Sequence, residues 1–342
     1  MKIVTYKDYQ EYLKRNNMVR IEDQTIELVP IEITRLEPQL EEMTDISTTV
    51  WSFPKRGKWA THKGDYRGNW PPQMARALIL KYTEPGNIIL DQMVGSGTTC
   101  VEARLLGRNC IGVDINFNAV ILTLHRLYYL EKYAKNRIRW STELFEPPLE
   151  LLNNILSTWS RIYHGDARHL TEINDESIDL IATHPPYFNI IRYGGQKKEE
   201  GDLSKTRKLE TYLKWIRMIA EESYRVLKPG KYCGILIGDT RIHRHFVPIS
   251  HYVLQMFLDA GFILKEEVVK IQHKMKTTRE VWNKIKDRDF LLIYHEKLFI
   301  LRKPEKGEKL SKYKYSRRLD INRILEDFEK RTLKDTVEKR NG

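Results

Sequence analysis

Strand-like and helix-like runs alternate along most of the chain, and this alternation limits the folds it can adopt. Apolar runs such as "NIILDQMV", "NCIGVDI" and "SIDLIATH" predict strands, with helix-like segments between them. Strands that alternate with helices form a largely parallel sheet covered on both faces. The last two strand-like runs, "FILKEEVVKIQHK" and "FLLIYHEKLFILRK", have no helix between them. The sequence therefore predicts an α/β fold with an antiparallel edge.

Composition indicates the size of the core, the charge of a partner and the cellular location. A chain of 342 residues that is 41% hydrophobic can bury a large core. A net charge of +12 suits an anionic partner such as nucleic acid, although a solvated lysine surface would give the same value. The start of the chain lacks the apolar stretch of a signal peptide, and no run is long enough to span a bilayer. We expect a cytoplasmic protein without a membrane partner.

Cysteine and histidine positions argue against disulfides and metals. Cys100, Cys110 and Cys233 form no C-x-x-C pair, so we expect reduced cysteines rather than a disulfide framework. The histidines at positions 243, 245 and 251 lack a fourth ligand at a fitting spacing, so we expect no metal.

Composition changes divide the chain into three parts. Residues 1–50 form an N-terminal extension in which we see no chemistry. Residues 51–304 hold the alternating pattern and form the main domain. Residues 305–342 form a basic and amphipathic tail.

A glycine turn in "LDQMVGSGTTCVEA" joins a predicted strand to a predicted helix. Gly95 and Gly97 let a ligand approach the backbone, and the following helix N-terminus favours anionic groups. Thr98 and Thr99 follow directly, so the Gly-Lys-Ser/Thr of a phosphate-binding P-loop is absent. A G-x-G turn alone is weak evidence, and its neighbours decide the ligand.

Acidic residues at strand ends indicate a nucleoside cofactor. Asp114 ends the strand after the glycines and can accept hydrogen bonds from ribose hydroxyls; the alternative is that it caps the next helix. Asp166, in "YHGDARHL", can accept from an adenine amino group. A dinucleotide and S-adenosylmethionine both fit this spacing. Asp91 favours the latter, because it can meet the ammonium of a methionine moiety, which NAD lacks.

A second motif, "IATHPPYFN", follows a later strand. Pro185 and Pro186 end that strand and hold a stiff, extended turn. Such a rigid Pro-Pro-aromatic turn has no role in hydride transfer. This motif therefore also favours S-adenosylmethionine over a dinucleotide.

Together these motifs give a resemblance. The chain resembles the amino-group nucleic-acid methyltransferases, which methylate N4 of cytosine or N6 of adenine with S-adenosylmethionine. The likeness rests on "MVGSG", "GTTCVEARLLGRNCIGVDIN", "HPPY" and "VLKPGKYCGILIGD", from about Trp51 to Lys303. It implies a Rossmann-like class I methyltransferase fold with a mostly parallel seven-stranded sheet. Because the glycine loop precedes the PPY motif, it also implies circular permutation relative to the subgroup with "SPPYFNLRDYG".

The resemblance also implies a cofactor site. The methionine part is assigned to Asp91, Met93, Gly95, Ser96, Gly97 and Thr98. The ribose is assigned to Asp114 with its neighbour Ile115, and the adenine to Asp166 with its neighbour Ala167. The segment "THKGDYRGNWPP" is expected to pack over the cofactor, with His62 and Arg67 as contacts.

The HPPY motif fits methyl transfer to an exocyclic amino group. That nitrogen is a poor nucleophile, so two acceptors must hold its hydrogens and turn its lone pair toward the methyl group. The Pro185 carbonyl, held by the stiff turn with Pro186, is one candidate, and the side chain of His184 is the other. Tyr187 is expected to stack on the extruded base, with Phe188 nearby.

His184 departs from the Asp, Asn or Ser that the family carries at this position. Neutral imidazole can accept a hydrogen bond, so we expect activity to fall below about pH 6 if His184 takes part directly. The alternative is a loop residue that points to solvent while only backbone carbonyls act.

The substrate is predicted less sharply. Residues after the motif are candidates for contacting nucleic acid, or they belong to a solvated loop: Asn189, Arg192, Tyr193, Lys197 and Lys198. We favour N4 of cytosine in DNA, with amino methylation of structured RNA and N6-adenine methylation as alternatives. Methylation at C5 needs a cysteine nucleophile, normally after a proline, and none of the cysteines has that setting. A non-catalytic binding module is disfavoured because the cofactor residues are all present.

Overall fold

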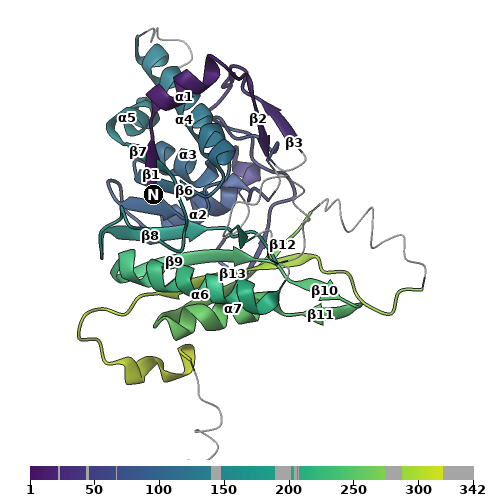
Figure 1. Ribbon diagram of the computed structural model, residues 1–342. Coiled ribbons are helices and arrows are strands. Elements are labelled where there is room, and N and C mark those ends of the chain that lie inside the picture. The colour runs from purple at the N-terminus through teal and green to yellow at the C-terminus, as the bar shows by residue number, and fades with distance from the viewer. Residues whose placement is uncertain are drawn as a thin grey trace, which may run out of the picture.

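One mixed sheet organises the protein. The computed structural model describes residues 1–21, 24–43, 46–66, 68–139, 148–188, 202–203, 206, 208–273 and 287–318. Within these residues nine strands form a sheet in the order β1-β7-β6-β5-β8-β9-β13-β12-β4 (Figure 1). The α/β class predicted from the alternating pattern is confirmed.

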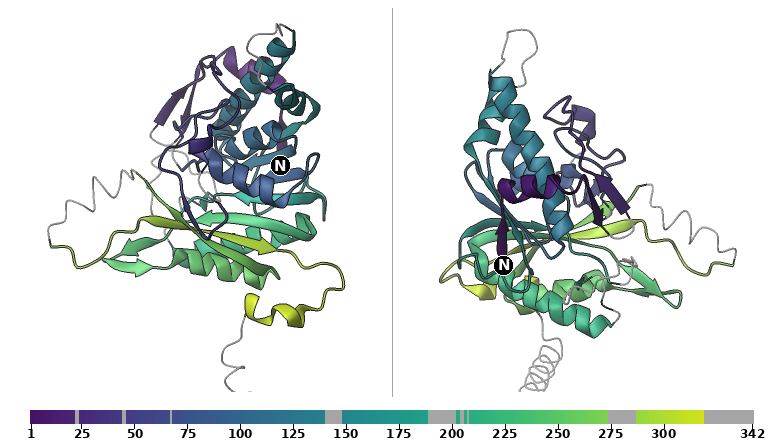
Figure 2. Two further views of the ribbon diagram at one scale, coloured as in Figure 1. Left: turned by 180° about the vertical axis from the view of Figure 1, so that it is seen from behind. Right: turned by 45° about the horizontal axis from the view of Figure 1, so that its top comes forward.

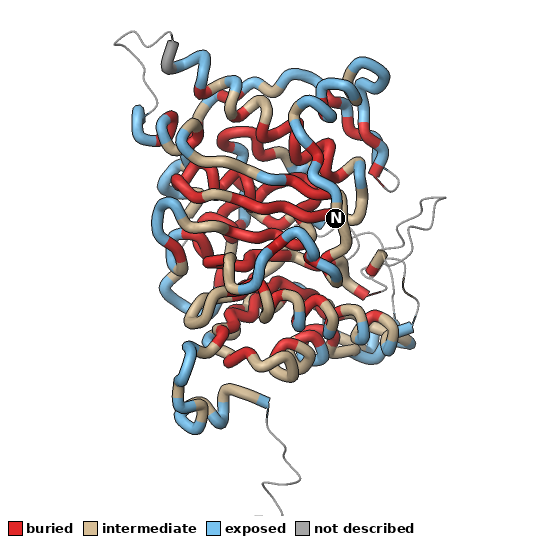
Figure 3. Tube along the Cα trace, turned by 60° about the vertical axis from the view of Figure 1, so that its left-hand side comes forward, coloured by how far each residue is buried: buried red, intermediate tan, exposed pale blue. Residues whose placement is uncertain are grey.

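The centre of the sheet is parallel. Its five strands are β5 (Ile88–Asp91), β6 (Asn109–Asp114), β7 (Ser160–His164), β8 (Ile178–Thr183) and β9 (Leu227–Ile237). Their apolar sequences match their position, because strands covered on both faces need apolar residues at nearly every position. Every residue of β8 is buried, and Figure 3 shows the buried residues gathered in the middle of the molecule.

Antiparallel strands complete the sheet. β13 (His295–Arg302) pairs with β9 and with β12 (Ile263–Ile271), as predicted for the last two strand-like runs. The outer strands are β1 (Lys2–Val4), antiparallel to β7, and β4 (Val50–Ser52), parallel to β12. The sheet therefore has nine strands where seven were predicted. Three-residue strands are too short to show a periodic pattern, so the sequence did not reveal them.

Helices cover both faces of the sheet (Figures 1 and 2). One face carries α1 (Tyr6–Leu13), α2 (Pro72–Tyr82), α3 (Thr98–Leu105), α4 (Phe117–Arg139) and α5 (Leu149–Ser157). The other carries α6 (Leu209–Val226) and α7 (Ile249–Asp259). Each face has its own apolar core, and successive residues of a strand supply opposite cores: Ile89 joins the first and Leu90 the second.

Short elements lie outside the main sheet. β2 (Met18–Ile21) and β3 (Gln24–Glu27) form one hairpin, and β10 (Thr240–Ile242) and β11 (His245–Val247) form another. Two 3₁₀ helices span Leu40–Glu42 and Leu310–Ser316. No helix in the described part of the chain is both long and apolar enough to cross a membrane.

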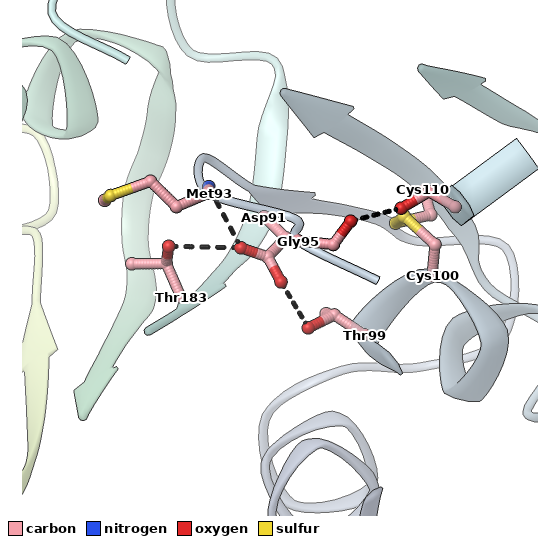
Figure 4. Close-up of a disulfide and its surroundings, with 8 residues drawn as sticks. Asp91, Met93, Gly95, Thr99, Cys100, Cys110 and Thr183 are labelled. Carbon is pink, nitrogen blue, oxygen red and sulfur yellow. Dashed lines mark hydrogen bonds between the residues drawn. A yellow bond between two sulfur atoms is a disulfide. The ribbon is translucent and has the colours of Figure 1, made fainter. Parts of the chain in front are cut away.

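A disulfide joins α3 to β6. Cys100 and Cys110 are fully buried, their Cα atoms lie 5.3 Å apart, and their sulfur atoms are bonded (Figure 4). The expected reduced state is wrong for this pair, because α3 packs against β6 and brings the two positions face to face. Cys233 is buried and free.

Candidate active site

The glycine turn and the HPPY motif meet at the carboxyl ends of β5 and β8. These two strands are parallel neighbours, with Leu90 opposite Ile181. Asp91 ends β5, and Thr183 ends β8 immediately before the HPPY motif. The Thr183 hydroxyl donates a hydrogen bond of 3.1 Å to Asp91 Oδ1 (Figure 4). Two motifs that lie about 90 residues apart in the chain therefore form one site.

Asp91 is a buried carboxylate held by further donors. Its Oδ2 accepts from the Thr99 hydroxyl at 2.5 Å, and its Oδ1 accepts from the Met93 amide at 3.2 Å (Figure 4). Burial raises the pKa of Asp91 to about 6, although these hydrogen bonds oppose the shift. At neutral pH the residue carries a negative charge, at the place where a cationic group of a ligand would be stabilised.

The backbone of the glycine turn requires its glycines. Gly97 has a φ of 84° in the left-handed region, and a Cβ there would lie 2.9 Å from Thr123 Cγ2. Gly95 has a φ of 53°, and a Cβ there would lie 3.0 Å from the Tyr66 ring. The turn therefore leads directly into α3 in a conformation that larger residues would disturb.

Tyr66 and Asn69, from the segment "THKGDYRGNWPP", contact this turn, and the packing of that segment over a cofactor stays a prediction. The Tyr66 ring lies against Gly95, and the Thr98 hydroxyl donates to Asn69 Oδ1 at 2.6 Å. The hydroxyl of Ser96 is buried, and no described residue forms a hydrogen bond with it. Such an unpaired buried group needs a partner, which a polar ligand at this turn would supply.

Asp114 ties the next strand to the turn. Its Oδ2 accepts from the Gly95 amide at 2.9 Å, and its Oδ1 accepts from the Asn116 amide at 2.9 Å. Burial raises the pKa of Asp114 to about 7, against the effect of these two hydrogen bonds. At the start of α4, Asn116 Oδ1 accepts from the Asn118 amide at 2.9 Å. The capping role considered for Asp114 therefore falls to Asn116.

Asp166 and its neighbours lie at the end of β7. Both Asp166 oxygens accept from Arg168 Nε at 3.0 Å, and the Arg168 guanidinium stacks on Trp215 at 4.5 Å. The Ile115 carbonyl accepts from His164 Nε2 at 3.0 Å, and Ala167 is buried. The contact between Asp166 and an adenine stays a prediction, and Arg168 shares the carboxylate in this structure.

His62 belongs to a buried polar network. Glu102, on α3, pairs with His62 Nε2 at 2.7 Å, accepts from Trp59 Nε1 at 2.7 Å and accepts from Arg76 Nη1 at 3.1 Å. Burial lowers the pKa of His62, against the pull of Glu102. The network fixes the cover segment to α3, and a cofactor contact of His62 stays a prediction.

His184 is part of a hydrogen-bonded chain of side chains. Its Nε2 lies 2.5 Å from the Tyr187 hydroxyl, which donates to Glu296 Oε1 on β13. Lys270 Nζ, on β12, donates to Glu296 Oε2 at 2.7 Å. Trp70 stacks on the His184 ring, with 6.1 Å between the ring centroids and 21° between the ring planes. The alternative in which His184 points to solvent is wrong.

The environment of His184 also corrects its expected titration. Burial lowers its pKa to about 4, with the Glu296 carboxylate opposing and Lys270 and Arg56 adding to the shift. The ring is therefore neutral throughout the range from pH 7 to pH 5. The expected fall in activity below about pH 6 assumed an ordinary pKa, and it moves toward pH 4.

The PPY turn is anchored from two sides. The Tyr187 ring lies against Gly238, where a Cβ would approach Tyr187 Cε2 to 2.7 Å. The Tyr212 hydroxyl donates to the Pro186 carbonyl at 3.1 Å, and Tyr212 also packs against the buried ring of Phe188. Phe188 thus supports the turn from the core, and its contact with a base stays a prediction.

Several site residues were not predicted: Tyr66, Asn69, Trp70, Lys270 and Glu296. The first three belong to the aromatic segment that was expected to cover the cofactor. For Glu296 the available signal is a carboxylate two residues before the apolar run "LFIL" in β13, where it is 5% exposed. Predicted residues outside the described part of the chain are Arg67, Asn189, Arg192, Tyr193, Lys197 and Lys198.

The β10–β11 hairpin is a cationic and aromatic projection beyond the end of β9 (Figures 1 and 2). Its turn residues His243 and Arg244 have positive φ values of 48° and 69°. The Arg241 and Arg244 guanidinium groups lie 4.9 and 5.7 Å from the centre of the Phe290 ring. Among the described residues, no group of three His, Cys, Asp or Glu is placed to hold a metal ion.

Three curated proteins share part of this sequence. The Type II methyltransferase M.BglII of Bacillus subtilis is 31% identical over 36% of this chain and 33% of its own length. The DNA adenine methyltransferase YhdJ of Escherichia coli K12 is 26% identical over 40% of this chain and 47% of its own. A tRNA (guanine(10)-N2)-dimethyltransferase of Methanocaldococcus jannaschii is 31% identical over 34% of this chain and 28% of its own. The chain thus spans less than half the length of each.

A family model extends the match to both ends of the chain. The model of the N6/N4 DNA methylases matches residues 3–123 and 178–341, which include the glycine turn and the HPPY motif. This match covers well over half of the chain, including β5, β8 and β13. The chain therefore belongs to the N6/N4 DNA methylase family.

Proposed function

We propose that this protein transfers a methyl group from S-adenosylmethionine to an exocyclic amino nitrogen of a base in nucleic acid, specifically N4 of cytosine in DNA. The observation that carries the proposal is the meeting of the glycine turn and the HPPY motif at adjacent strand ends, joined by the Thr183–Asp91 hydrogen bond. Methyl donor and acceptor nitrogen must lie in contact for transfer, and this arrangement supports such a contact.

The residues around the glycine turn fit S-adenosylmethionine. Asp91 would pair with its ammonium, the hydroxyl of Ser96 has no described partner, and the N-terminus of α3 favours its carboxylate. Asp114 would accept from the ribose hydroxyls. When bound, the cofactor supplies an electrophilic methyl group. The residues around the glycine turn would hold and orient it.

The HPPY turn would hold the target base. The Pro185 carbonyl and a ring nitrogen of His184 accept hydrogen bonds from the amino group and so direct its lone pair. Tyr187, whose hydroxyl is fixed by Glu296, presents its ring for stacking on an extruded base. The anchoring of this turn by Tyr212 and Gly238 keeps both acceptors in a stiff geometry.

Nucleic acid is the polymer that the surface supports. The β10–β11 hairpin carries Arg241, His243, Arg244 and His245 beside the end of β9, against which Tyr187 packs. A two-stranded ribbon fits the major groove of DNA, and its cations suit phosphates. DNA is favoured by the family description, whereas the similar tRNA methyltransferase supports structured RNA as the first alternative. N6 of adenine is the second alternative, supported by the likeness to YhdJ.

Transfer of tritiated methyl groups from S-adenosylmethionine to bulk DNA and bulk RNA tests the proposal. We expect counts in DNA, and nucleoside analysis of that product should give N4-methylcytidine. Counts only in RNA would establish the first alternative, and N6-methyladenine in DNA would establish the second. Counts in neither polymer, with intact cofactor binding, would leave a non-catalytic binding module.

Two variants separate the two halves of the site. Tyr187→Ala should abolish transfer while calorimetry shows unchanged cofactor affinity. Asp114→Ala should weaken cofactor affinity first. The reverse pattern would show that the cofactor and base sites have been assigned the wrong way round.

A further inference from the structure

Glu296 and Lys270 form a buried ion pair beside the proposed base site. They face each other across the β12–β13 pair, and both are less than one tenth exposed. A buried ion pair is weak evidence for stability, because the cost of desolvation offsets the attraction. This pair contacts the candidate active site, because Glu296 also accepts a hydrogen bond from the Tyr187 hydroxyl.

The charge of Glu296 decides where the proton of Tyr187 lies. Burial would raise the pKa of Glu296, but the Lys270 ammonium, together with His184 and the Tyr187 hydroxyl, outweighs burial and holds the pKa below its usual range. An ionised carboxylate can only accept hydrogen bonds, so the single hydroxyl hydrogen of Tyr187 points to Glu296. The Tyr187 oxygen can therefore only accept a hydrogen bond from His184 Nε2, which lies 2.5 Å away. Nε2 must therefore carry the ring hydrogen.

The other ring nitrogen is left as an acceptor. His184 Nδ1 is buried, and no described residue forms a hydrogen bond with it, although the Gly68 backbone lies close enough to favour a protonated ring. An unpaired buried acceptor is unfavourable, so its presence in an active site needs a reason. The family carries Asp, Asn or Ser at this position, and each of these offers an acceptor oxygen.

We propose that Glu296 and Tyr187 hold His184 in the Nε2–H tautomer, so that the Nδ1 lone pair accepts a hydrogen of the target amino group. This inference rests on the proposed function for its substrate. Glu296 and Tyr187 act here as positioning residues through His184. Trp70 stacks on one face of the ring, whereas the Nδ1 lone pair lies in the plane of the ring.

The proton balance follows from this tautomer. As the amino nitrogen would form its bond to the methyl carbon, the methyl–sulfur bond of the donor would break with its electron pair left on sulfur. The amino nitrogen would then be cationic, and its proton would pass to Nδ1. The resulting imidazolium keeps its Nε2–H on Tyr187 and is stabilised by Glu296, while Lys270 and Arg56 oppose the charge. The Nδ1 proton then leaves to water, and the neutral ring returns. A ring that is a weak base suffices, because a methylated amino cation is a strong acid.

Nitrogen-15 NMR of the histidine-labelled protein tests the tautomer without any substrate or activity. The His184 signals are assigned by their loss in His184→Asn. We expect two-bond correlations that place the hydrogen on Nε2 in the wild type, and a shift toward the Nδ1–H form in Tyr187→Phe, which removes the acceptor oxygen. Tyr252→Phe, at an exposed tyrosine on α7, is the matched control. A hydrogen on Nδ1 in the wild type would overturn the proposal.

A double-mutant cycle tests the consequence for catalysis. Tyr187→Phe keeps the ring for stacking and should lower kcat about 100-fold when His184 is present. In a His184→Asn background the acceptor is an amide oxygen that needs no tautomer, so the same change should cost less than about 3-fold. Equal losses in both backgrounds would overturn the inference. Absence of methyl transfer by the wild type would contradict the proposed function alone, because the NMR result still decides the tautomer.

Discussion

The two halves of the candidate active site are held in different ways. The cofactor half is the glycine turn with Asp91 and Asp114, and the base half is the HPPY turn with His184 and Tyr187. The carboxylates of the cofactor half accept hydrogen bonds mostly from nearby groups in the chain, such as Thr99 for Asp91 and the Asn116 amide for Asp114. His184, in the base half, depends on Tyr187 and, through it, on Glu296 from the far end of the sequence. Burial disfavours the charged form in both halves, but with opposite directions of pKa. The pKa values of Asp91 and Asp114 are raised toward 7, whereas the pKa of His184 is lowered away from 7.

The disulfide gives the largest expected effect, and it belongs to the cofactor half alone. Reducing the Cys100–Cys110 bond should lower the free energy of unfolding by about 3 kcal/mol, because a cross-link of this span restricts the unfolded chain. Urea unfolding with and without reductant measures the change. The Cys100→Ser, Cys110→Ser double variant should match the reduced wild type and should not respond to reductant. An unchanged unfolding curve on reduction would show that the disulfide does not contribute to the free energy of unfolding.

Loss of the Asp91 charge should be the next largest effect. Asp91→Asn keeps the size of the side chain but removes a charged hydrogen-bond partner, so affinity for S-adenosylmethionine should fall by about 30-fold, or about 2 kcal/mol. Calorimetry measures it, with the exposed Asp175→Asn as the control for a changed surface charge. A similar loss in the control would mean that long-range charge, rather than contact with Asp91, drives cofactor binding.

The raised pKa values of Asp91 and Asp114 predict a pH-dependent affinity for the cofactor. Asp91 and Asp114 ionise at about pH 6 and 7, so cofactor affinity should rise about 10-fold between pH 5.5 and 7.5. Asp114→Asn should flatten the upper part of this rise. Stability should change in the other direction: between about pH 4 and 7 the folded carboxyls keep protons that the unfolded chain has lost, so their contribution falls as pH rises. A flat affinity profile would contradict this account.

His184 contributes to stability with the opposite sign. Its folded pKa of about 4 lies below that of the unfolded chain, so the unfolded state binds the extra proton and its stabilising contribution is lost as pH falls from about 6.5 to 4. Comparing the wild type with His184→Asn across this range isolates the contribution. A difference between the two that does not change with pH would show that the ring is not buried in its neutral form.

The smallest expected effect lies outside both halves, on the β10–β11 hairpin. Arg244→Ala should weaken nucleic-acid binding about 5-fold and reduce the slope of log affinity against log salt by about 1, as for the loss of one phosphate contact. Arg15→Ala, an exposed arginine near the end of α1, is the matched control. Equal effects of the two variants would assign binding to net charge rather than to the hairpin.

The cofactor half could be read from the sequence because its information is local. Asp91, Gly95, Gly97 and Asp114 lie within two strand–turn–helix units, so their spacing alone placed them at one edge of a parallel sheet. Glu296 could not be assigned in this way, since its approach to Tyr187 depends on the order β8-β9-β13 and on strand register. The disulfide was missed for the same reason, because it depends on how α3 packs against β6.

Both outer edges of the sheet are formed by the first 52 residues. β1 covers the free edge of β7, and β4 covers the free edge of β12. An uncovered strand presents unpaired amide and carbonyl groups to any other chain and so favours aggregation. The N-terminal segment, which carries none of the predicted chemistry, thus supplies the short strand at each edge of the sheet. A variant that begins at residue 53 would keep the glycine turn and the HPPY motif. It would also expose the edges of β7 and β12, which could pair with strands of other copies of the chain.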